Sequence, residues 1–132
     1  MTNEITAPIT LDSIIITAPI TLGGSTYVGT NTIQTQSEDI VLTESDLNTI
    51  HICTAAAQLT LPEITNSMIG KWIRLKKNTT ETVSYLTAGS DTIEGDTTIT
   101  NSTTDLADFI DLIAESLTNW GAYAARGTWV GA

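Results

Sequence analysis

From residue 38 onward the chain is a series of short segments in which apolar and polar residues alternate, each closed by a turn signal. The clearest of these segments is Lys71–Lys77, where Ile73 and Leu75 share one face and the residues between them share the other. A period of two is the spacing of side chains along a strand. Short strands with turn signals every 8–12 residues or so are typical of an all-β sandwich, roll or barrel.

The amino-acid composition favours β-strands, and the net charge argues against a nucleic-acid partner. Thr and Ile dominate the chain, and both are β-branched residues that favour strands over helices. The chain has 132 residues and a net charge of −10, so it would repel a phosphate backbone, and we expect no nucleic-acid partner. No apolar run approaches the roughly 18 residues of a membrane span, and no signal peptide is expected.

The sequence ITAPITL occurs twice near the N-terminus, at Ile5–Leu11 and at Ile16–Leu22. Each copy alternates apolar and polar residues around a proline, which removes one ladder N–H, so the segment is either an edge strand or an extended segment outside a sheet. We therefore predict that residues 1–37 form an extended N-terminal arm and that residues 38–132 form the β-domain. The residues expected to bind a partner through the arm are Ile5, Pro8, Ile9, Ile16, Pro19 and Ile20.

The stretch at residues 106–117 fits two secondary structures. Its apolar residues recur at helical spacing, and Asp105 would cap the helix. The alternative is a strand that turns Ile110, Leu112 and Ala114 inward.

Four of the five basic residues lie close together, at Lys71, Arg74, Lys76 and Lys77. One interpretation is a solvated strand face. The other is a face that contacts an acidic neighbour, such as another copy of this chain. On the second interpretation, Lys71, Trp72, Arg74 and Lys76 form an inter-subunit face.

Few residues suit catalysis or metal binding. His51 and Cys53 are the only His and Cys in the chain. A closed zinc site needs four ligands, so only a symmetric oligomer could complete one around them, and a half-exposed strand face is the simpler interpretation. One cysteine excludes an intrachain disulfide. The carboxylates lie mostly in turns, and no nucleophile or phosphate-loop motif is present. We expect no metal, no cofactor and no catalytic residue.

Four motifs occur in a fixed order: Thr60–Pro62 after a strand, the strand Gly70–Lys77, the turn Asp91–Gly95 and the pair Asn119–Trp120. Together they resemble a β-domain that recurs in phage virion proteins: capsid decoration proteins, head fibres, and domains of tail fibres and tailspikes. The resemblance covers residues 38–129 and implies a compact, commonly trimeric β-fold without chemistry of its own. It also implies a strand before Asn119, although residues 114–117 lack the expected glycine turn, which keeps a short helix open.

These observations predict an all-β protein: a compact β-sandwich or roll-like domain of short antiparallel strands with an extended N-terminal arm, forming a homotrimer. We expect a complete, non-enzymatic phage structural protein that is made in the host cytoplasm. The first hypothesis is a capsid decoration (cement) protein that binds the major capsid protein on the outside of the shell and stabilises it. The alternative is a short fibre or tail/baseplate component for host attachment, and a remote one is a small glycan-degrading enzyme with a carboxylate pair.

Overall fold

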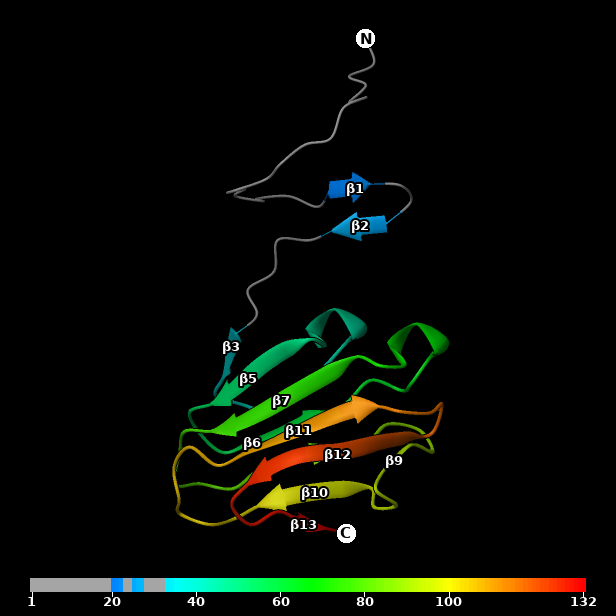
Figure 1. Ribbon diagram of the computed structural model, residues 1–132. Coiled ribbons are helices and arrows are strands. Elements are labelled where there is room, and N and C mark those ends of the chain that lie inside the picture. Colours follow the sequence, from blue (N-terminus) through cyan, green and yellow to red (C-terminus); the bar gives the residue numbers. More distant parts are fainter. Residues whose placement is uncertain (1–19, 23–24, 28–32) are drawn as a thin grey trace. The chain divides into compact units, whose positions relative to one another are not determined.

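The structure is a computed structural model, and it describes residues 20–22, 25–27 and 33–132. The chain divides into two units, Met1–Thr30 and Asn31–Ala132. In the first unit, strands β1 (Ile20–Leu22) and β2 (Ser25–Tyr27) pair as an antiparallel hairpin. The second unit holds the remaining strands (Figure 1).

The second unit consists of two sheets, so the predicted all-β class is confirmed. The large sheet contains, in spatial order, β3 (Ile33–Gln36), β5 (Thr49–Cys53), β7 (Trp72–Lys77), β11 (Phe109–Ala114), β12 (Asn119–Arg126) and β9 (Thr92–Ile93). The small sheet contains β13 (Val130–Gly131), β10 (Thr98–Asn101), β8 (Val83–Leu86), β6 (Ala57–Thr60) and β4 (Ile40–Val41). Two short 3₁₀ helices, η1 (Glu44–Asp46) and η2 (Asn66–Met68), lie in the connections.

Up to residue 86 the chain crosses between the sheets after every strand. Strands β3, β5 and β7 belong to the large sheet, and β4, β6 and β8 belong to the small one. Each turn of this coil returns in the same direction, so neighbouring strands of this half are parallel. The prediction of antiparallel strands is therefore wrong here, because the turns that we expected to close hairpins lead instead to the opposite sheet.

The C-terminal half is mainly antiparallel. Strand β10 pairs antiparallel with β8, β11 with β7, and β12 with β11. The exception is β9, which pairs parallel with the start of β12. The fold is therefore a parallel coil completed by antiparallel strands.

Strand β3 lies before residue 38, within the stretch that we interpreted as arm and linker. Its residues Ile33–Gln36 pair in parallel with β5. The large sheet thus begins N-terminal to the domain start that we expected from the sequence.

Residues 109–114 form β11, and the prediction of a strand in this stretch is confirmed. Ile110, Leu112 and Ala114 face the core and are at most 1% exposed. The helical spacing of the apolar residues does not prevail, because β7 and β12 pair with both edges of this segment.

The core lies between the two sheets and is one continuous cluster. The large sheet contributes Ile73, Leu75 and Trp120, and the small sheet contributes Leu59 and Tyr85, all of which are fully buried. Burying an apolar side chain of this size stabilises the fold by about 1.5–3 kcal/mol. The two sheets are held together chiefly by this cluster, and the other side of the large sheet faces away from it.

Candidate binding face

We call the side of the large sheet that turns away from the core the outer face. Cross-strand pairing aligns its residues in rows, in which Ile50 lies beside Arg74 and Arg74 beside Asp111. A second row joins Lys76 to Phe109. The residues of the outer face used below are Ile50, Ile52, Trp72, Arg74, Lys76, Phe109, Asp111, Ile113, Tyr123 and Arg126.

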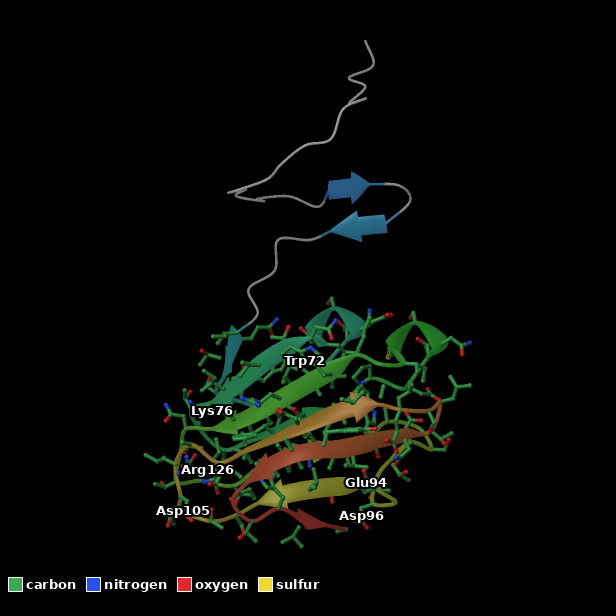
Figure 2. All side chains as sticks on the ribbon, viewed as in Figure 1. Trp72, Lys76, Glu94, Asp96, Asp105 and Arg126 are labelled. Carbon is green, nitrogen blue, oxygen red and sulfur yellow. The ribbon has the colours of Figure 1, made fainter. Side chains whose placement is uncertain are left out.

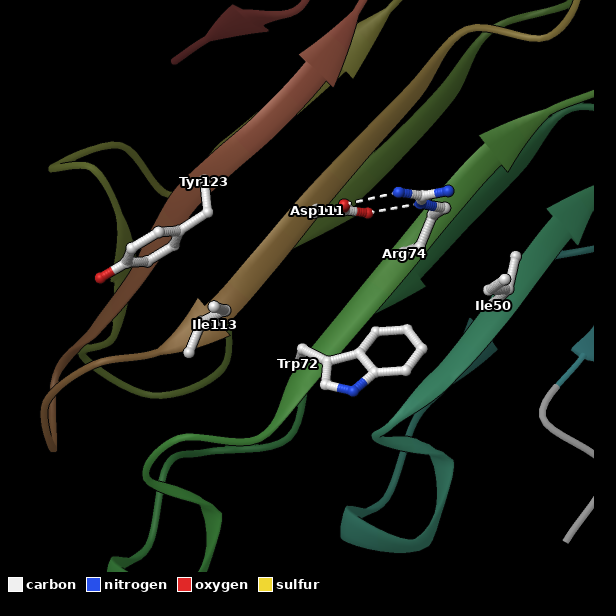
Figure 3. A pocket seen from close by; sticks show the side chains of 6 residues that line it. All are labelled: Ile50, Trp72, Arg74, Asp111, Ile113 and Tyr123. Atoms are coloured by element: carbon white, nitrogen blue, oxygen red, sulfur yellow. Dashed lines mark hydrogen bonds and ion pairs between the residues drawn. The ribbon is translucent and has the colours of Figure 1, made fainter.

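A depression of about 410 Å³ lies on this face, and Figure 3 shows the six side chains that line it: Ile50, Trp72, Arg74, Asp111, Ile113 and Tyr123. They come from β5, β7, β11 and β12. Trp72 is 37% exposed and Tyr123 is 61% exposed. Tyr and Trp combine a large apolar surface with one polar atom, which makes them common in protein interfaces. The depression therefore has the composition of a binding surface.

Arg74 and Asp111 form a two-point ion pair within the depression. Arg74 Nε donates to Asp111 Oδ1 at 2.6 Å, and Nη2 donates to Oδ2 at 2.7 Å. Donating these hydrogen bonds to the Asp111 carboxylate raises the pKa of Arg74. The guanidinium also lies 4.2 Å from the centre of the Phe109 ring. Because the geometry is bidentate and the arginine stacks on the ring, this pair is held in one orientation.

The other predicted members of the inter-subunit face differ in their surroundings. Lys71 Nζ is already engaged with Glu44 Oε1 at 2.9 Å, and this hydrogen bond is the main reason why the pKa of Glu44 is lowered. Trp72 and Lys76 share the outer face with Arg74, as predicted from alternation. Neither Lys76 nor Arg126 forms an ion pair with any of the described residues. These two cations are therefore available to a partner.

Lys77 does not belong to a solvated face. It is fully buried, and its Nζ donates to the backbone oxygens of Thr79 and Thr103 at 2.6 Å each. The reason is the period of two, which turns Lys77 inward when Lys76 points outward.

His51 and Cys53 are also inward, so the interpretation as a half-exposed strand face is wrong. Both side chains are fully buried. His51 Nε2 donates to the Asp46 carbonyl at 2.9 Å, and Nδ1 accepts from Gln36 Nε2 at 3.2 Å. Burial lowers the pKa of His51 and raises that of Cys53 to about 11. Both residues are enclosed in the core of one chain, so they cannot meet their counterparts on a symmetry axis.

Within the described ranges, no group of three or more His, Cys, Asp or Glu side chains is placed to hold a metal ion. The helices in this part of the chain are also too short or too polar to cross a membrane.

The arm residues Ile5, Pro8, Ile9, Ile16 and Pro19 lie outside the described residues. Ile20 is the first residue of β1, where it pairs with Tyr27. Partner binding through the arm stays a prediction.

Sequence reasoning missed several residues of the depression. Ile113 and Asp111 could have been predicted, because a strand at 109–114 with Ile110 inward necessarily turns its odd-numbered residues outward. Tyr123 had no such signal, because the register of β12 against β11 shifts beside it.

No protein-family model matches the chain, and no curated protein has a significantly similar sequence.

Proposed function

We propose that this chain is a non-enzymatic structural protein of a bacteriophage particle that works by binding protein surfaces. The observation that carries the proposal is the outer face, where an aromatic depression lies beside Lys76 and Arg126, two cations without an ion-pair partner among the described residues. The chain as a whole has a net charge of −10. A basic, aromatic face on an acidic protein suits binding to an acidic protein surface.

The resemblance of residues 38–129 to the β-domain of phage virion proteins supports the particle as the place of binding. Within that class we propose a capsid decoration (cement) protein, which binds the major capsid protein on the outer surface of the shell as a homo-oligomer. Binding across neighbouring shell subunits would stabilise the shell through the buried interface area.

One observation favours a second candidate, a short fibre or baseplate component for host attachment. Trp72 and Tyr123 are both exposed, on either side of Ile113, in a depression that also contains the Arg74–Asp111 pair (Figure 3). Aromatic surface with a few fixed polar groups is also the composition of a receptor-binding site.

The experiment is to measure the copy number of this protein, relative to the major shell protein, in purified particles of the phage that encodes it. A copy number comparable with that of the shell protein supports decoration. A number that is far smaller supports the fibre, and absence from the particle rejects both.

The role of the outer face is tested in the same particles with Trp72→Ala/Tyr123→Ala. Because aromatic residues at the centre of an interface often contribute 2 kcal/mol or more, we expect occupancy measured at limiting protein to need roughly tenfold or more protein. The matched control is Ile69→Ala/Leu117→Ala, which removes exposed apolar side chains from outside the depression. Equal loss in the two variants would reject the outer face as the binding surface.

A further inference from the structure

Strand β12 extends well beyond the short strand β9, which pairs with one of its two edges. Strand β11 pairs with β12 from Trp120 to Arg126. On the other side, β9 pairs only with Asn119 and Trp120. From Gly121 to Arg126, no strand in the described part of the chain lies beside this edge.

The free part of β12 does not show the burial pattern of a strand on a core. Residues 122–126 are five consecutive exposed residues, whereas a strand with one covered face buries every second residue. Both faces of this stretch are therefore accessible, together with its edge. Its side chains are mostly small, with alanine at 122, 124 and 125, so another backbone can approach closely.

Two contacts limit the free edge at its ends. Glu94 Oε1 accepts a hydrogen bond from the Ala122 N–H at 2.8 Å, and Trp129 Nε1 donates to the Arg126 carbonyl at 2.9 Å. Between these ends, at 123–125, no lysine or proline protects the backbone, and the register shift beside Tyr123 is the one local irregularity of this edge. An exposed edge without such protection is a template for another strand.

We propose that this edge pairs antiparallel with the same edge of a second copy of the chain, with the two-fold axis at Ala124. The two large sheets then form one continuous sheet across the dimer. This inference deepens the proposed function, because it names the first partner of the protein as another copy of itself.

The charges at the two ends of the edge select a second copy as the partner. Figure 2 shows Arg126 and Glu94 toward opposite ends of β12. Because the register shift beside Tyr123 makes Ala122 and Ala124 consecutive positions of the strand, antiparallel pairing about Ala124 places Ala122 of one copy opposite Ala125 of the other. Glu94, which is bound at Ala122, then lies beside Arg126 of the second copy, and the two-fold axis repeats this ion pair. The edge is thus complementary in charge to itself.

Asp105 is an exposed carboxylate toward the same end of the domain as Arg126 (Figure 2). Lys76 lies in the neighbouring row of the outer face. A second carboxylate, Asp108, lies next to Gly127, but it is buried and accepts a hydrogen bond from Asn101 Nδ2 at 2.9 Å. Of these four charged groups, Asp105 is therefore the only carboxylate that solvent or a partner can reach.

A two-fold contact predicts a dimer, whereas the resemblance to virion domains implies a trimer. A ring of three copies joins two different edges, because a self-complementary patch is used up by one partner. The two arrangements place different residues opposite one another, so they can be separated by cross-linking.

The first test is disulfide trapping of full-length Ala124→Cys. Directly opposed residues of an antiparallel pair have Cα atoms about 4.5–5.5 Å apart, which suits a disulfide. Under mild oxidation we expect a covalent dimer to form about tenfold or more faster than in Asn78→Cys, an exposed control position away from the edge, because pairing raises the local thiol concentration. The wild type, whose only thiol is the buried Cys53, should give no covalent dimer.

The register is tested by Ala122→Cys and Ala125→Cys, which should cross-link more slowly than Ala124→Cys. Faster trapping at either of them, or trapping of Ala124→Cys no faster than of Asn78→Cys, overturns the proposed pairing.

The second test reverses the charges and follows the dimer by analytical ultracentrifugation. Arg126→Glu and Glu94→Arg alone should each weaken dimerisation by about tenfold or more, because like charges then meet twice. The combined Glu94→Arg/Arg126→Glu variant keeps the net charge of the wild type and should regain most of the affinity. Added salt should weaken the wild-type dimer.

A wild type that is monomeric or trimeric, or a combined variant no better than the single ones, overturns the inference. Glu38→Arg is the matched control for Glu94→Arg, since Glu38 is exposed and makes no ion pair with the described residues; an equal effect of Glu38→Arg would attribute the loss to net charge and overturn the contact. The copy number in particles is measured separately, so failure of the dimer is distinguishable from failure of the proposed function.

Discussion

Strands β5 and β7 are parallel neighbours in the large sheet, yet they distribute their residues in opposite ways. Strand β7 buries the apolar residues Ile73 and Leu75. Strand β5 buries His51 and Cys53 instead, and it leaves Ile50 half-buried on the outer face. Two strands with the same alternation thus present different chemistry to the same core.

Register explains the difference. Directly paired residues of neighbouring strands lie on the same face of a sheet, and His51 pairs with Leu75 while Cys53 pairs with Lys77. Once Leu75 is inward, His51 has to be inward as well. Alternation within a strand shows which residues share a face, but the neighbouring strand decides which face is buried.

The difference between the core face and the outer face of the large sheet is tested most strongly by shortening one isoleucine on each face. We expect Ile73→Ala to lower the free energy of unfolding by about 3–4 kcal/mol, because it leaves a cavity in a fully buried site. Ile50→Ala should cost about 1 kcal/mol or less, because this side chain borders the open depression. Urea unfolding measures both values, and similar losses would contradict the assignment of the two faces.

Adjacent lysines give a second, smaller contrast. Lys77→Met should lower the free energy of unfolding by about 2 kcal/mol, because the carbonyls of Thr79 and Thr103 lose their common donor inside the protein. Lys76→Met is the matched control and should change stability by about 0.5 kcal/mol at most. If Lys77→Met lowers the free energy of unfolding no more than Lys76→Met in the same urea experiment, Lys77 is not buried as described.

The smallest expected effect is a pH dependence that comes from the polar inner face of β5. Burial lowers the pKa of His51, so the unfolded chain binds its proton more readily than the folded one. The neutral ring therefore stabilises the fold fully above the ordinary value of 6.5, and this contribution is lost as the pH falls through the lowered value. The free energy of unfolding should decrease between about pH 7.5 and pH 5.5.

His51→Gln should flatten that part of the profile. The stabilisation linked to the lowered pKa of Glu44 is fully present above its ordinary value of 4.5 and is lost only at lower pH, so the two effects occupy separate pH windows. A wild-type profile that is already flat between about pH 5.5 and 7.5 would show that His51 is not held neutral by burial.

The local pattern of apolar and polar residues was sufficient to predict some parts of this fold but not others. Alternation predicts that Ile73 and Leu75 of β7 share one face, and alternation together with the resemblance predicts the strand at 109–114. The parallel coil of the N-terminal half cannot be predicted in this way, because its strand pairs join residues far apart in sequence, such as Thr49 with Ile73. No local signal distinguishes a turn that leads to the opposite sheet from a turn that closes a hairpin.

The candidate site shows the same limit. Trp72, Arg74 and Lys76 were placed together on one face because they belong to one strand. Asp111 and Tyr123 join them only through cross-strand register, and the shift in β12 beside Tyr123 cannot be read from one strand.

The buried thiol of Cys53 is a natural chemical probe for local opening of the fold. Strand β5 holds Cys53 between Gln36 of β3 and Lys77 of β7. Alkylating reagents require both access and a thiolate, and burial withholds both, with the pKa of Cys53 raised to about 11. The rate at which Cys53 is alkylated under native conditions therefore reports how often the core around this thiol opens, without any introduced label.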